Sequence, residues 1–255
     1  MEEKKMLFRP INLKSDKIQT QVYQLLKKEI ARGAFPDGKL PSEPKLAEAL
    51  GVSRATISAT LSSLQRDGII IRKHGSATYV NKQFASIKAS ITEGVSIYEI
   101  ISNCGYSPSL KWSKRCILSQ PDIPKNISKK LELSDEDQII RFERLFCADG
   151  NPAAYVEEYI PCKNLKGEIP EDEKLPSTLY EMAEEYCTSP IEFTVVDVVP
   201  CVPEDSVSNL FEKGTGRGIL LVEELHLNNC SEPIVFSKVN TFDKYIRFQA
   251  MRIKR

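Results

Sequence analysis

Arg54 and Gly75 are the residues whose types and positions point most directly to chemistry. An arginine at the start of a helix can donate two parallel hydrogen bonds to guanine, and a helix N-terminus favours a phosphate group. Gly75 stands in the basic turn Arg72-Lys-His-Gly-Ser76 and lets a backbone approach DNA closely, because it lacks a Cβ atom. These two features indicate binding of nucleic acid.

The sequence carries no familiar signature of catalysis or of metal binding. There is no nucleophile elbow or zinc-protease motif, and Gly214-Thr-Gly-Arg-Gly218 lacks the spacing of a phosphate-binding loop. His226 alternates with leucines and is predicted to lie on one face of a strand, in a structural or surface role. The seven cysteines include no CxxC pair, so we expect neither a zinc site nor a disulfide framework, and no cofactor.

The elements that must position Arg54 and Gly75 follow from the spacing of apolar residues. Apolar residues that recur every three or four positions predict an amphipathic helix that ends at Gly33. These residues are Ile18, Val22, Leu25, Leu26 and Ile30. Ser42 and Ser53 are predicted to cap a second and a third helix, which only Gly51-Val52 separates. The β-prone runs 69–71 and 77–80 predict a hairpin, so the order is that of a winged helix-turn-helix.

Charge divides the chain into two modules. Residues 1–82 carry 15 Lys and Arg against 8 Asp and Glu, a balance of +7, whereas residues 83–255 carry 20 against 27, a balance of −7. A basic module of about 80 residues most often binds nucleic acid or an anionic surface. No run of about 18 apolar residues occurs, and the polar start leads into no signal region, so we expect neither membrane insertion nor secretion.

From residue 15 to residue 80 the sequence resembles the GntR family of bacterial transcription regulators. The resemblance rests on Leu40-Pro-Ser-Glu43, Leu50-Gly-Val-Ser-Arg54, Gly68-Ile-Ile70 and His74-Gly75. It implies that Ser53, Arg54 and Thr56 open a reading helix in the major groove, and that His74 and Gly75 form a wing tip at the minor groove. Many members carry arginine where this chain has Pro44 and Ser58, so the operator sequence does not carry over. The DNA-contacting positions expected on this basis are Ser42, Lys45, Ser53, Arg54, Thr56, Ser58, His74 and Gly75.

Residues 81–94 are predicted to be a linker, and residues 95–255 a second domain. Turn signals such as Asp149-Gly-Asn-Pro152 predict consecutive strands with short connections. We expect strands over 110–118, 138–147, 153–160, 191–200, 218–228, 233–242 and 246–253. We expect helices over 95–103, 124–131, 177–187 and 203–213. This order predicts an antiparallel sheet with helices packed against it, which is an α+β domain.

The second domain resembles the UTRA effector domain, which marks the HutC subfamily of GntR regulators and has a fold similar to chorismate lyase. The resemblance rests on Arg141–Arg144, Asp149–Pro152, Glu157–Pro161, Thr178–Tyr180, Ser237 and Asp243–Tyr245. It implies a cleft for a small, usually anionic metabolite, lined by Arg144, Glu158, Ser177, Thr178, Tyr180 and Ser237. An arginine and a helix start suit a phosphate or carboxylate, and a glutamate can accept hydrogen bonds from hydroxyls.

Structural alternatives stand beside the cleft interpretation. Arg144 and Glu158 can pair across neighbouring strands, and Ser177 can simply cap its helix. Phe146 stands where sugar-phosphate-binding members often carry a second arginine, which suggests a ligand that is less charged or more apolar.

Together these features predict a cytoplasmic homodimer that reads an inverted repeat in double-stranded DNA and is released by a small-molecule effector. Activation in place of repression stays open. So does a DNA-binding protein whose effector pocket has lost its function. The alternative from a different class of protein is an enzyme that uses the lyase-like domain, and the missing catalytic motifs argue against it.

Overall fold

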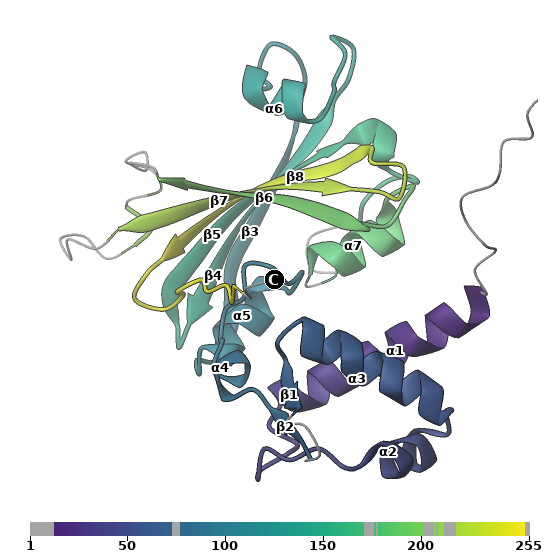
Figure 1. The fold of residues 1–255 in the computed structure, drawn as a ribbon. Helices are drawn as coiled ribbons and strands as arrows, with labels where there is room; N and C mark the ends of the chain where they lie inside the picture. Colours follow the sequence, from purple (N-terminus) through teal and green to yellow (C-terminus); the bar gives the residue numbers. More distant parts are fainter. Residues whose placement is uncertain are drawn as a thin grey trace, which may run out of the picture. The chain divides into compact units, whose positions relative to one another are not determined.

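The computed structural model describes residues 13–72, 77–170, 176, 178–200, 207, 209–211 and 218–252. These residues form two compact units. One unit ends at Ile87 and also takes up Met251 and Arg252, and the other comprises Lys88–Ala250. In Figure 1 the helices of the first unit are purple and blue, and the sheet of the second runs from teal to yellow.

The first unit contains three helices whose apolar faces meet in one core. They are α1 (Leu13–Ala31), α2 (Glu43–Leu50) and α3 (Arg54–Arg66). The buried side chains recur at the helical spacing of the sequence, among them Val22, Leu26, Ile30, Leu46, Ile57, Leu61 and Leu64. Gly51 ends α2 with φ of 64°, a left-handed conformation that favours glycine and lets α3 follow after a short turn.

A two-stranded wing completes the predicted motif. β1 (Ile70–Arg72) pairs antiparallel with β2 (Thr78–Val80), and Ile71 lies opposite Tyr79. Nη2 of Arg72 donates to Oε1 of Glu43 at 2.9 Å, which ties the wing to the start of α2. The winged helix-turn-helix predicted from the sequence is confirmed. The predicted wing tip at His74 and Gly75 lies outside the described residues.

The segment predicted as a linker divides between the two units. Asn81 caps the short helix α4 (Lys82–Ala85), which the sequence analysis did not predict. The amide of Asn81 also donates to the carbonyl of Gly68 at 2.8 Å, so α4 begins at the base of the wing. Lys88 and the residues that follow it, as far as Ala250, belong to the second unit.

Within the described residues, the second unit is built on a six-stranded antiparallel sheet in the order β3-β4-β5-β8-β7-β6. Its strands are β3 (Pro108–Leu118), β4 (Ile139–Ala148), β5 (Asn151–Pro161), β6 (Phe193–Pro200), β7 (Ile219–Leu227) and β8 (Pro233–Phe242). The antiparallel α+β architecture predicted from consecutive strands with short connections is therefore confirmed. A short 3-10 helix, η1 (Cys162–Asn164), follows β5.

Helices cover both faces of the sheet (Figure 1). On one face lie α5 (Ile97–Asn103), with Tyr98 edge-on to Phe146 at 5.3 Å, and α7 (Leu179–Tyr186), whose Met182 belongs to a core with residues of β4, β5 and β8. On the other lies α6 (Lys125–Lys130), whose Ile127 packs in a core with Phe236. We call these the α7 face and the α6 face. Residues alternate between them along each strand.

Two predicted elements differ from the structure. Residues 246–252 form no strand, although Gln249 makes an isolated parallel bridge with Ser90. Ile246 is buried in the same core as Phe242, so the apolar residues of this segment reflect packing and not a ladder. The helix predicted over 203–213 falls mostly outside the described residues.

Candidate functional site

The start of α3 holds the first group of predicted site residues. Ser53 caps the helix: its Oγ accepts from the backbone N of Thr56 at 3.1 Å and lies 2.8 Å from Oγ1 of Thr56. Arg54 is the first helical residue, is exposed, and makes no hydrogen bond or ion pair with any described residue. The cap therefore fixes two hydroxyls and leaves the guanidinium available to a phosphate or a base edge.

The other described DNA-contact candidates lie on α2 and α3. Ser42 precedes α2, is exposed and makes no side-chain cap bond, and Lys45 is an exposed residue of α2. Ser58 is half-buried on α3. Of these three, Lys45 offers a cation, which suits a phosphate contact.

Replacing Ser53 by alanine is expected to lower the stability of the first unit by about 1 kcal/mol, because the N-terminal amides of α3 lose their acceptor. Chemical denaturation of the full chain, followed by far-UV circular dichroism, measures the change. Ser62→Ala is the matched control, since the Ser62 hydroxyl only donates to the carbonyl of Ser58 within the helix. An equal loss in both variants would contradict the capping role.

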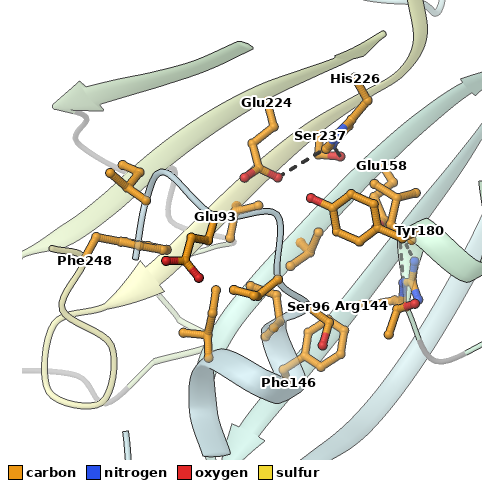
Figure 2. Close-up of a pocket in the computed structure, with 18 of the residues that line it drawn as sticks. Glu93, Ser96, Arg144, Phe146, Glu158, Tyr180, Glu224, His226, Ser237 and Phe248 are labelled. Atoms are coloured by element: carbon orange, nitrogen blue, oxygen red, sulfur yellow. Dashed lines mark hydrogen bonds and ion pairs between the residues drawn. The ribbon is translucent and has the colours of Figure 1, made fainter. Parts of the chain in front are cut away.

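A pocket on the α7 face of the second unit brings together five predicted cleft residues from separate elements (Figure 2). They are Arg144 on β4, Glu158 on β5, Thr178 and Tyr180 at the start of α7, and Ser237 on β8. The sixth candidate, Ser177, lies outside the described residues.

Arg144 and Glu158 form a buried ion pair at the pocket wall. Nε of Arg144 donates to Oε2 of Glu158 at 3.0 Å, and Nη2 donates to the same oxygen. The residues are only 6% and 4% exposed. Arg144 lies opposite Val156 in the ladder, so Glu158 is its diagonal neighbour on the same face. The structure thus shows the pairing across neighbouring strands that the sequence allowed, and the role of Arg144 toward an anionic ligand stays a prediction.

A second polar network surrounds His226 on β7. Its Nδ1 is 3.0 Å from Oγ1 of Thr194, and its Nε2 is 3.1 Å from Oγ of Ser237 and 3.7 Å from Oε2 of Glu224. The ring is 1% exposed, and burial lowers the pKa of His226 to about 3, so the imidazole is neutral near pH 7. Burial, followed by the nearby Glu158 carboxylate, raises the pKa of Glu224 to about 7.

Two regions of the sequence match known families, one in each unit. Residues 18–80 match the bacterial regulatory proteins of the gntR family, and residues 105–240 match the UTRA domain. The chain belongs to the GntR family, in its UTRA-containing branch. The HTH-type transcriptional repressor NagR of Bacillus subtilis is 27% identical over 207 residues, which span 81% of this chain and 82% of NagR.

Further comparisons agree with this placement. The HTH-type transcriptional regulator Rv0792c of Mycobacterium tuberculosis is 27% identical over 225 residues, or 84% of this chain and 78% of Rv0792c. The crystal structure of YydK, a possible transcriptional regulator of Bacillus subtilis, has the same fold, with a TM-score of 0.66 at 15% identity over 92% of this chain and 99% of that one. The protein is thus a DNA-binding transcription regulator of the GntR family with an effector domain.

In this GntR regulator the start of α7 is engaged by its own cap. Oγ1 of Thr178 accepts from the backbone N of Glu181 at 3.2 Å. The Tyr180 ring lies edge-on to His226, with centroids 6.2 Å apart. A Cβ atom at Gly94 would lie 2.9 Å from the Tyr180 hydroxyl oxygen, so any larger residue at this position in the loop before α5 would make the Tyr180 ring shift. That loop thereby closes one side of the pocket.

Sequence reasoning missed several lining residues of this GntR regulator. They are Glu93, Ser96, Glu224, His226 and Phe248. His226 lies on one face of β7, as predicted, and its ring is buried at the pocket. Glu224 and His226 are two positions apart on β7 and therefore share one face. This pair of polar residues in an otherwise apolar strand was the signal in the sequence that could have pointed to the pocket.

The described residues of this GntR regulator contain no group of three or more His, Cys, Asp and Glu that could hold a metal ion. Among the described helices, none is long and apolar enough to cross a membrane.

Proposed function

We propose that this GntR regulator is a cytoplasmic repressor that binds an inverted-repeat operator as a homodimer and leaves it when a small molecule occupies the second unit. The observation that carries the proposal is the pocket, in which five cleft residues expected from the UTRA resemblance meet. A two-fold protein matches a two-fold site, and two copies of α3 would enter successive major grooves.

The lining of the pocket supports a direct route from ligand to DNA-binding unit. Ser90, Ile91, Glu93, Val95 and Ser96 line it, and they follow the junction at Ile87 by only a few positions. Phe248 also lines it, just before the chain returns at Met251. A ligand that contacts both segments can favour one arrangement of the junction over another, up to the difference in its affinity for the two states.

We propose further that the pocket binds its ligand without turnover. Ser237, His226 and Glu224 are the residue types of a hydrolytic triad, but a triad places the hydroxyl and the carboxylate on opposite ring nitrogens. Here both approach Nε2, and Thr194 contacts Nδ1. A general base also needs a pKa near the working pH, whereas the pKa of His226 is lowered to about 3.

The test is selection of genomic fragments from the source organism by the purified full chain at two salt concentrations. Nonspecific contacts to phosphates weaken steeply as salt rises, whereas contacts to base edges persist. We expect a few fragments that share an inverted repeat to survive at high salt. Recovery of unrelated fragments at low salt, and of none at high salt, would contradict sequence-specific repression.

A further inference from the structure

Among the described residues, more acidic than basic side chains line the pocket. Its lining holds one arginine, Arg144, and three carboxylates, those of Glu93, Glu158 and Glu224. Arg144 directs two N–H groups to Glu158, so this pair is neutral as a unit. Glu93 has an interaction of its own, so the carboxylate left to meet a ligand is that of Glu224.

Glu224 has no cationic partner among the described residues. Nε2 of His226 lies 3.7 Å from Oε2 of Glu224, but that imidazole is neutral and already bound to Ser237. The Glu224 side chain is 29% exposed, and it lines the pocket. A carboxylate withdrawn from water without a cation is disfavoured in its charged form, and a positive group beside it would restore that form.

Aromatic side chains supply the remaining recognition chemistry. Phe146, Tyr180 and Phe248 line the same pocket (Figure 2). The hydroxyl of Tyr180 lies on the side of its ring that is nearer Glu224 (Figure 2). Aromatic faces attract organic cations, and a carboxylate beside them adds a charge-assisted hydrogen bond.

We propose that the effector is an organic cation whose ammonium or guanidinium group binds Glu224 and whose apolar part lies against the aromatic walls. The inference rests on the proposed function of this pocket as the effector site. An anionic effector is disfavoured by the same arrangement, because it has to displace Glu158 from Arg144 in a buried position, where an unpaired carboxylate is costly.

The proposal predicts a dependence on pH. The ionised form of Glu224 binds a cation, so effector affinity rises between about pH 6 and pH 8, through its pKa of about 7. The other titratable or charged groups of the pocket are Glu93 on the loop, Arg144 on β4, Glu158 on β5, Tyr180 on α7 and His226 on β7. The pKa of Tyr180 is raised by burial and that of His226 lowered by burial, so both stay neutral across this interval.

The probe is a metabolite extract of the source organism, separated at pH 7 on ion-exchange resins into cationic, neutral and anionic fractions. Each fraction is added to the full chain on its selected operator fragment, and operator affinity is measured. A change with the cationic fraction supports the proposal. A change with the neutral or the anionic fraction overturns the proposal that the effector is a cation and leaves the proposed function standing. No change with any fraction overturns both.

Glu224→Gln keeps the side-chain shape and removes the charge. We expect it to need about 10- to 100-fold more of the cationic fraction for the same effect, with no dependence on pH between 6 and 8. Glu223→Gln is the matched control, because Glu223 lies on the α6 face of the same strand, 3.0 Å from Nζ of Lys130. Equal responses of the two variants overturn the role of Glu224. Thermal melts of both confirm that they fold.

Discussion

Replacing Arg144 by alanine is expected to destabilise the second unit by about 3–5 kcal/mol, because Glu158 is left buried without a partner. Nε and Nη2 of Arg144 both donate to one oxygen of Glu158, and a side chain as short as alanine cannot replace them. Urea denaturation monitored through Trp112 fluorescence measures the loss, since the only tryptophan of the chain lies on β3 of this unit. The size of the effect reflects desolvation of the orphaned carboxylate, not the net strength of the pair.

Two comparison variants separate these contributions. The double variant Arg144→Met with Glu158→Leu should regain most of the stability, because apolar pairs of similar volume replace buried ion pairs at little cost. Arg141→Ala, on the α6 face of the same strand, should cost far less, since Arg141 is 31% exposed and its contact with Glu143 is 3.3 Å. A loss below about 1 kcal/mol in Arg144→Ala would show that water reaches Glu158 freely.

Arg54→Ala should weaken operator binding by about 1–3 kcal/mol for each reading head, if the guanidinium forms a bidentate contact with a base. The exposed position of Arg54 at the start of α3, with no partner among the described residues, is the reason for the size of the effect. Binding to the selected fragment and to a scrambled fragment is measured in parallel. The loss should be larger on the selected fragment.

Lysine at the same position distinguishes base reading from phosphate binding. Lysine keeps the charge but not the planar fork, so Arg54→Lys should restore binding to phosphate and not the discrimination of a base. Arg66→Ala is the matched control at the other end of α3, where the side chain is 76% exposed and 3.6 Å from Asp67. If Arg54→Ala and Arg66→Ala bind the selected fragment equally, Arg54 does not read the operator.

The helices and strands could be predicted where burial alone sets the residue pattern. Leu61 and Leu64 repeat at helical spacing because α3 buries one face, whereas β5 is a nearly continuous buried run because both faces of the sheet are covered. The segment 246–252 is also rich in apolar residues, but Ile246 is buried by packing in the core and not by a neighbouring strand. Composition cannot separate these two causes of burial.

The candidate site could be predicted only in part, because its contacts depend on register. The sequence left open whether Arg144 and Glu158 bind a ligand or each other, and the diagonal position of Glu158 across β4 and β5 brings the two side chains together. The environment of His226 comes from Thr194 and Ser237, which lie 32 and 11 positions away in the chain. Such neighbours follow from the strand order β8-β7-β6, which no local pattern encodes.

The path of the chain makes the effector module an insertion in the DNA-binding unit and not an appendix to it. The chain leaves the first unit after Ile87 and re-enters it at Met251, whose sulfur lies 3.8 Å from the amide nitrogen of Asn81. Gln249 accepts from the backbone N of Ile91, and its own N donates to the carbonyl of Ala89, so the outgoing and returning segments lie side by side. A hybrid regulator that exchanges effector modules therefore requires two splice points. A single fusion after Ile87 would remove Met251 and Arg252 from the DNA-binding unit that the hybrid is meant to keep.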